Sequence, residues 1–236
     1  MSTTIVLISS AFVAYFLESI FGFGGTIIFL TIAGFNIDFK LALEVAMFAG
    51  MFSGLAVLIQ SYKKMNVLHV KKIVLLTLPG VIIGTFLIDI LQINILLKLF
   101  SSLLITYGLL TLLIPKMDLP KWIDQMFVIL GGFIQGIFTI GGPFVLMGYK
   151  NNFSGKQELR ATMAGFFFLI NFYRLLQNYF TGGTVIVTFL SYYWLGFFIM
   201  IAVWIGYVFH VKIPEKVFYL CMVLGLTTIG FVLLLR

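Results

Sequence analysis

Glu18 is an ionisable side chain inside an apolar stretch, and three glycines follow it within seven residues. The segment reads Glu-Ser-Ile-Phe-Gly-Phe-Gly-Gly-Thr and ends at Thr26. Ionisable groups inside a membrane are costly and are functional candidates by default. Glu18 could carry a proton, because burial disfavours the charged form of a carboxylate. The alternative is a structural role as the partner of a cation elsewhere in the chain.

The glycines predict a break in the helix that this stretch would otherwise form. Glycine weakens a helix by roughly 1 kcal/mol relative to alanine, and the adjacent Gly24 and Gly25 can reach backbone angles that other residues resist. A helix that restarts after such a break has unpaired backbone N–H groups and the positive end of its dipole. Helix ends of this kind bind anions without a charged side chain, and Thr26 could add a hydroxyl donor.

The same pattern recurs 117 positions later, with Gln135 in the place of Glu18 and the pair Gly141–Gly142 in the place of Gly24–Gly25. Pro143 follows, and proline suits the first turn of a helix because its missing N–H costs nothing there. Two restarted helices that meet would make a site for a small anion. The predicted backbone contribution comes from Gly24, Gly25, Thr26, Gly141, Gly142 and Pro143. The alternative is that the glycines only allow helices to pack closely.

Asn171 and Arg174 lie one turn apart in a later apolar stretch. A guanidinium offers a planar fork that suits oxyanions, and an asparagine amide adds donors. Both residues are therefore candidate substrate contacts, although Arg174 could instead reach the membrane surface or pair with Glu18. No His, Cys, Asp and Glu cluster has metal-ligand spacing, and no nucleophile–base pair is evident. We predict no metal site, no cofactor and no enzyme activity.

The composition indicates an all-α, polytopic membrane protein. Its 236 residues are 61% hydrophobic and only 10% charged, whereas soluble domains carry about 25% charged residues. Eight apolar runs approach or exceed the roughly 20 residues that a transmembrane helix needs, so we expect one transmembrane domain over residues 1–236. The net charge of +7 is typical of basic loops on one membrane side, and no nucleic-acid partner is expected.

The runs divide into two predicted repeats, about 1–116 and 121–236. If all eight runs cross the bilayer, the repeats are parallel, and seven basic residues lie on the cytoplasmic side of the membrane and six on the other side. If the first run of each repeat folds back at its glycines, the repeats are inverted, and eleven basic residues lie on the cytoplasmic side and two on the other side. Cytoplasmic loops carry an excess of Lys and Arg, and inverted repeats with broken helices are typical of secondary transporters. We favour the inverted arrangement. The eleven residues are Lys63, Lys64, Lys71, Lys72, Lys116, Lys121, Lys150, Lys156, Arg160, Lys212 and Lys216, and the two are Lys40 and Arg236.

Four motifs resemble the TauE/SafE sulfite exporter family of membrane permeases. They are Gly22-Phe-Gly-Gly-Thr26, Gly141-Gly-Pro143, Gly155-Lys-Gln-Glu-Leu-Arg-Ala-Thr162 and Asn171. In that family a glycine-rich break opens each half, and the second half carries an Ala-Arg-Ala-Thr-like step into a helix with an asparagine. The resemblance covers nearly the whole chain and departs at Thr139, where a glycine is expected. It implies transport of sulfite or a related organosulfur anion across the bacterial plasma membrane.

Together these patterns predict a secondary transporter for a small anion, working by alternating access at the paired broken helices. H+ is the candidate coupling ion, through Glu18. The expected partners are the anion and the lipid bilayer, and a homo-oligomer is a candidate assembly. The alternative is a membrane-embedded binding or assembly subunit without transport of its own.

Overall fold

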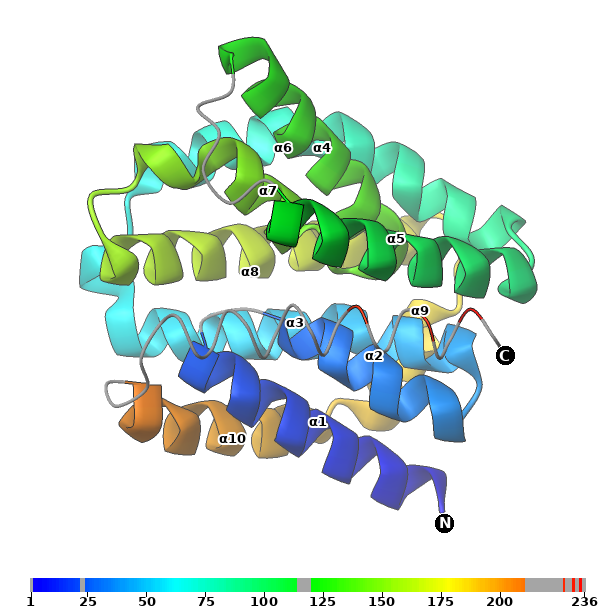
Figure 1. Ribbon diagram of the computed structural model, residues 1–236. Coiled ribbons are helices and arrows are strands. Elements are labelled where there is room, and N and C mark those ends of the chain that lie inside the picture. The colour runs from blue at the N-terminus through cyan, green and yellow to red at the C-terminus, as the bar shows by residue number, and fades with distance from the viewer. Residues whose placement is uncertain are drawn as a thin grey trace.

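The computed structural model describes residues 2–21, 24–113 and 120–210, with three single positions nearer the C-terminus, 227, 231 and 234. These residues form helices and no strands (Figure 1), which confirms the all-α prediction for this part of the chain. The α-helices are α1 (Thr3–Phe21), α2 (Gly25–Asn36), α3 (Phe39–Ser61), α4 (Val67–Ile90), α5 (Ile93–Leu113), α6 (Lys121–Phe138), α7 (Gly142–Tyr149), α8 (Lys156–Phe180), α9 (Val185–Tyr192) and α10 (Leu195–His210). Short 3-10 turns at Tyr62–Lys64 and Lys150–Asn152 follow α3 and α7.

The first predicted break lies between α1 and α2, and the chain folds back there as a hairpin. Gly24 takes a left-handed conformation, with φ 96°, directly before α2. Glycine adopts this conformation without the steric cost that a side chain brings. Tyr15 on α1 lies within reach of two residues on α2: its hydroxyl is 3.4 Å from the Thr26 hydroxyl, and its ring centroid is 6.4 Å from that of Phe29. Such contacts are possible only if α2 returns along α1, as Figure 1 shows.

The second break lies between α6 and α7 and makes a second hairpin. A Cβ on Gly131 would lie 2.8 Å from the Val145 side chain, and one on Gly148 would lie 2.1 Å from the Asp124 carbonyl oxygen. Residues progressively earlier in α6 therefore face residues progressively later in α7. The left-handed residue here is Thr139, with φ 62°, so α6 ends slightly before the glycine pair that predicted the break.

α3 and α8 lie side by side in antiparallel orientation (Figure 1). Near one end of the pair, Gln60 accepts a hydrogen bond from Arg160 at 3.3 Å. Further along, a Cβ on Gly54 would lie 2.9 Å from the Ala164 carbonyl oxygen, and a Cβ on Gly50 would lie 2.8 Å from Nδ2 of Asn171. Residues nearer the start of α3 therefore contact residues nearer the end of α8, as expected for antiparallel helices.

α4 and α6 pack closely through glycines spaced one turn apart on both helices. Gly80 and Gly84 lie on α4, and Gly132 and Gly136 lie on α6. A Cβ on Gly132 would lie 2.3 Å from the carbonyl oxygen of Thr77. Small residues at this spacing let two membrane helices approach backbone to backbone. At this interface the glycines therefore allow two helices to pack closely, which is the alternative role that we considered for the glycines of the two breaks.

Three helical stretches of the described chain are long and apolar enough to cross a membrane: Thr3–Ile20, Phe39–Lys64 and Val67–Ile88. α9 and α10 together would make a fourth span, bent by 70°, and they cover one of the eight apolar runs, residues 184–209. At the bend, the indole N–H of Trp194 donates to the Ser191 carbonyl oxygen at 3.0 Å. The predicted eighth run, after Glu215, falls outside the described residues apart from the three single positions.

Candidate functional site

The two breaks meet at a cavity of about 30 Å³, which we call the central cavity. A single water needs about 10–15 Å³ of such space, so the cavity has room for about two. Six of the residues predicted to form the site line it: Glu18, Gly24, Thr26, Gly142, Pro143 and Asn171. The remaining lining residues are Ile27, Gly50, Thr139, Ile140 and Phe167.

Glu18 caps the start of α2 with its own carboxylate. Its Oε2 accepts a hydrogen bond from the Gly25 N–H at 2.9 Å, and its Oε1 accepts one from the Ser53 hydroxyl of α3 at 2.5 Å. A negative charge is favourable at a helix N-terminus because it faces the positive end of the dipole. The first break therefore already holds an acidic group that belongs to the protein.

Gln135 plays the corresponding part at the second break, but as a neutral group. Its Oε1 accepts from the Gly141 N–H at 2.8 Å, and its Nε2 donates to Oδ1 of Asn171 at 3.0 Å. Because Oδ1 of Asn171 is used in this way, its Nδ2 is the atom left over. Asn171 is 1% exposed, and its Nδ2 has no hydrogen-bond partner among the described residues. The second break thus presents an unused amide donor beside the central cavity.

Two of the predicted glycines, Gly25 and Gly141, do not line the central cavity. Their N–H groups donate to Glu18 and Gln135.

Arg174 fixes the end of α6 and does not line the central cavity. Its Nη1 donates to the Thr139 hydroxyl oxygen at 2.7 Å, and its Nη2 donates to the Gly136 carbonyl oxygen at 2.7 Å. Its Nε donates to the Thr85 hydroxyl oxygen of α4 at 3.3 Å. Arg174 is 2% exposed, and its guanidinium lies where the negative end of a helix dipole favours a cation. This geometry makes Arg174 a positioning residue of the second break.

A family model described as sulfite exporter TauE/SafE matches residues 7–233, nearly the whole chain. The chain belongs to this family. TauE/SafE proteins are membrane transporters and not enzymes, so this chain is a membrane transporter that contacts a transported substrate and the lipid bilayer. No curated protein and no solved structure matches the chain significantly.

Arg160 is a second buried cation of this TauE/SafE protein, although its place in the sequence predicted a loop residue. It is 6% exposed, and its guanidinium lies 4.8 Å from the centroid of the Tyr207 ring. Without it, the inverted arrangement divides the basic loop residues ten against two. The helical spacing of Arg160, Phe167, Asn171 and Arg174 puts them on one face of a helix, and this spacing was the signal that could have identified Arg160.

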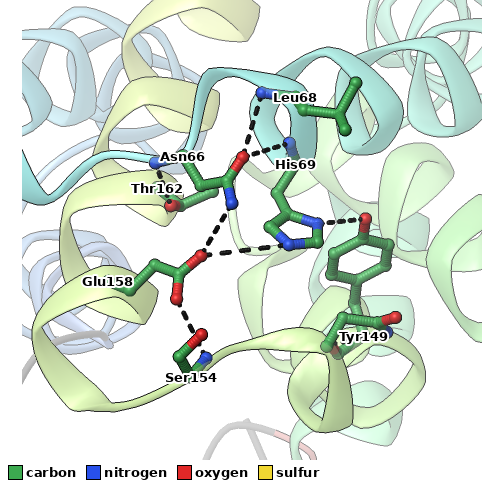
Figure 2. A network of polar contacts seen from close by, with 8 residues as sticks. Asn66, Leu68, His69, Tyr149, Ser154, Glu158 and Thr162 are labelled. Carbon is green, nitrogen blue, oxygen red and sulfur yellow. Dashed lines mark hydrogen bonds and ion pairs between the residues drawn. The ribbon is translucent and has the colours of Figure 1, made fainter.

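A polar network links the start of α4 to α7 and α8, as Figure 2 shows. Asn66 donates from Nδ2 to Oε1 of Glu158 at 2.9 Å and from its backbone N–H to the Thr162 hydroxyl oxygen at 3.1 Å. Nδ1 of His69 lies 2.8 Å from the Tyr149 hydroxyl, and its Nε2 lies 3.9 Å from Oε1 of Glu158. We call these five residues the Asn66–Glu158 network. It places the loop after α3 beside the loop before α8.

Proposed function

We propose that the protein is a secondary transporter that binds a small oxyanion, sulfite or a related organosulfur anion, between its two helix breaks. Alternating access would then carry the anion across the plasma membrane. The observation that carries this proposal is the unpaired Nδ2 of Asn171 at a cavity lined by both breaks. A buried donor without a partner is costly, and an anionic oxygen in the central cavity would satisfy it.

The second break is the better place for the anion because its cap is neutral. Gly142 and Pro143 line the central cavity at the start of α7, where the helix dipole favours negative charge. Thr139 also lines it, and its hydroxyl oxygen accepts from Arg174, so its own O–H proton is available to donate. Thr26 adds a hydroxyl from the first break. These groups would bind an oxyanion without an ion pair.

H+ is the coupling ion in this proposal, through Glu18. The carboxylate lines the same central cavity as Asn171, so an ionised Glu18 and a bound anion would repel each other. Protonation of Glu18 removes that repulsion and frees the start of α2 for the substrate. The anion and the proton would therefore bind together and move in the same direction.

The transport mechanism rests on two inverted repeats, about 1–116 and 121–236, in a multi-pass chain of eight apolar runs. Three observations support this arrangement: both first runs fold back as hairpins, α3 and α8 are antiparallel, and the Asn66–Glu158 network joins two loops at one end. Parallel repeats would put those two loops on opposite membrane sides. In inverted repeats, broken helices meet near the midplane, where secondary transporters bind substrate.

Sulfite flux into liposomes tests the function, measured for the wild type and for a variant that removes the Nδ2 donor of Asn171. Asn171→Asp keeps an oxygen for Gln135 Nε2 and replaces the cavity-side amide with a second carboxylate oxygen. We expect normal insertion and a KM for sulfite raised about tenfold or more, since a hydrogen bond to a charged group contributes about 1.5–3 kcal/mol. Glu18→Gln should keep flux and lose its response to an imposed pH gradient.

Asn178→Asp is the matched control, because Asn178 lies two turns further along α8 and uses Oδ1 to accept from the Val185 N–H at 2.9 Å. It should leave the KM unchanged. Absence of sulfite flux in the wild type, or an unchanged KM in Asn171→Asp, would contradict the proposal. Sulfite binding without flux would favour the alternative of a binding or assembly subunit.

A further inference from the structure

A second cavity, of about 20 Å³, adjoins the central one. Glu18 and Phe167 line both cavities, so these two side chains form a shared wall. Ser53 of α3 and Arg160 of α8 complete the polar part of the second cavity. The positions of Arg160 and Asn171 on α8 are separated by about 16 Å at 1.5 Å per residue. The second cavity therefore lies between the central cavity and the end of α8 that carries the Asn66–Glu158 network.

Arg160 brings a buried charge to this cavity without a carboxylate in direct ion-pair contact, although Glu18 lines the same cavity. Its Nη2 donates to the Ser19 hydroxyl oxygen at 3.2 Å and to Oε1 of Gln60 at 3.3 Å, both neutral acceptors. Among the described residues, its Nε has no hydrogen-bond partner and no carboxylate lies within 4.0 Å of its nitrogens. A buried guanidinium without a paired charge is costly. Arg174 differs, because its nitrogens are matched to three acceptors and it lines neither cavity.

We propose that Arg160 forms a second anion-binding subsite, which receives the transported oxyanion between the central cavity and the end of the molecule with the Asn66–Glu158 network. This inference rests on the proposed function and adds a second binding position to the path of the transported anion. Nε and Nη2 lie on one edge of a guanidinium, and such an edge binds two oxygens of one anion in a bidentate manner. The Nε proton is unused, and the anion would take over one Nη2 proton from Ser19 or Gln60, whose hydrogen bonds are long at 3.2 and 3.3 Å. The ligand class is therefore a small anion with at least two oxygens on one atom, rather than a halide.

A competing explanation is that Arg160 only offsets the charge of Glu18, since both side chains line the second cavity. The two explanations predict different outcomes for a double variant. If Arg160 only balances Glu18, neutralising both residues together restores sulfite binding. If Arg160 binds the anion, the loss in Arg160→Gln persists when Glu18→Gln is added.

The experiment measures sulfite binding by calorimetry in detergent and sulfite KM in liposomes. Four proteins are compared: wild type, Arg160→Gln, Glu18→Gln and the double variant. We expect Arg160→Gln to raise both the sulfite Kd and the KM about tenfold or more, with or without Glu18→Gln. Because Glu18→Gln removes a charge that repels the anion, the double variant is compared with Glu18→Gln and Arg160→Gln is compared with the wild type. The inference is overturned if the double variant binds sulfite as tightly as Glu18→Gln, or if Arg160→Gln binds and moves sulfite like the wild type.

Arg160→Lys serves if Arg160→Gln does not insert, because lysine keeps the charge and removes the bidentate edge. We expect weaker sulfite binding at an unchanged unfolding temperature, and wild-type affinity would overturn the inference.

Competition with chloride tests the ligand class: chloride should displace sulfite poorly from the wild-type protein. A wild type that moves sulfite, with Arg160 variants unaffected, removes the subsite and leaves the proposed function intact. A wild type that neither binds nor moves sulfite contradicts both proposals.

Discussion

Thr139 holds a backbone conformation that a β-branched residue rarely adopts, with φ 62° and ψ 21°. A left-handed conformation costs a residue with a side chain about 1–2 kcal/mol. The Thr139 hydroxyl oxygen offsets part of this cost because it accepts the 2.7 Å hydrogen bond from Nη1 of Arg174. Backbone strain of this kind concentrates at functional sites, and Thr139 lines the central cavity. Arg174 and Thr139 therefore act as a unit that sets the shape of the second break.

Stability measurements can separate the strain at Thr139 from its hydrogen bond. Thr139→Gly relieves the strain but leaves a buried Arg174 N–H unpaired, at a cost of about 1–3 kcal/mol. We expect it to leave the protein no more stable, or to destabilise it by about 1 kcal/mol. In an Arg174→Met background, the same substitution should stabilise by about 1 kcal/mol. Thermal unfolding in detergent gives both values, and an equal stabilisation in the two backgrounds would show that the hydroxyl plays no part.

At the residue scale, the sequence identifies polar groups and glycines within apolar runs but not their partners. Glu18 and Asn171 stand out because few polar residues interrupt such runs, and both line the central cavity. Arg160 and Arg174 are alike in type and both lie on α8, yet one lines a cavity and the other fixes a helix end. A long side chain can reach many acceptors, so its partner depends on tertiary packing.

At the scale of elements, the contact between α4 and α6 determines where the second break lies. α6 carries Gln135 and ends directly before Thr139, so a shift of α6 would move both residues. The glycines of this contact leave no space for a side chain: a Cβ on Gly84 would lie 2.5 Å from the Phe133 carbonyl oxygen. Backbone atoms in two packed helices cannot give way as a flexible side chain can.

Gly132→Ala should therefore destabilise the protein, because its new methyl would lie 2.3 Å from the Thr77 carbonyl oxygen. Overpacking a close contact costs about 1–3 kcal/mol, and we expect a loss in this range or above it. Gly155→Ala is the control, since a Cβ there meets nothing within 4 Å and its extended backbone accepts any residue. The measurement is the unfolding temperature in detergent. Equal unfolding temperatures for the two variants would argue against a tight α4–α6 contact.

The elements themselves were predicted unequally well. Both breaks follow from glycine pairs, because glycine changes what the backbone can do. The bend of 70° between α9 and α10 had a weaker signal, since a single glycine, Gly196 at the second position of α10, lies beside it in place of a glycine pair. A uniformly apolar run looks the same whether it is straight or bent, and the bend depends on contacts such as that of Trp194 with Ser191.

At the scale of the whole molecule, the charges of the loops and the contacts between them agree. The count of basic residues favoured the inverted arrangement from the sequence, without any knowledge of which loops meet. The Asn66–Glu158 network adds an independent physical reason, because hydrogen bonds of 2.8–3.1 Å require the two loops to lie at the same end. Sequence could not predict this network, since it joins residues 80–96 positions apart.

Single cysteines can determine the membrane side of each loop in a Cys221→Ser background. Tyr62→Cys and Asn151→Cys lie in the loops after α3 and before α8, and Asn36→Cys lies at the end of α2; all three positions are exposed. None of these substitutions removes a charged loop residue. The inverted arrangement puts Tyr62 and Asn151 in the cytoplasm, because basic loops are retained there, and puts Asn36 outside.

A membrane-impermeant maleimide should therefore label Asn36→Cys in intact cells and label Tyr62→Cys and Asn151→Cys only after permeabilisation. The Cys221→Ser parent controls for background, and labelling after permeabilisation shows that each cysteine is accessible. Opposite sides for Tyr62 and Asn151 would reject the inverted arrangement, since the Asn66–Glu158 network could not form across a bilayer. The same sidedness would put Arg160 between the central cavity and the cytoplasm, because it lies near the start of α8 beside this network.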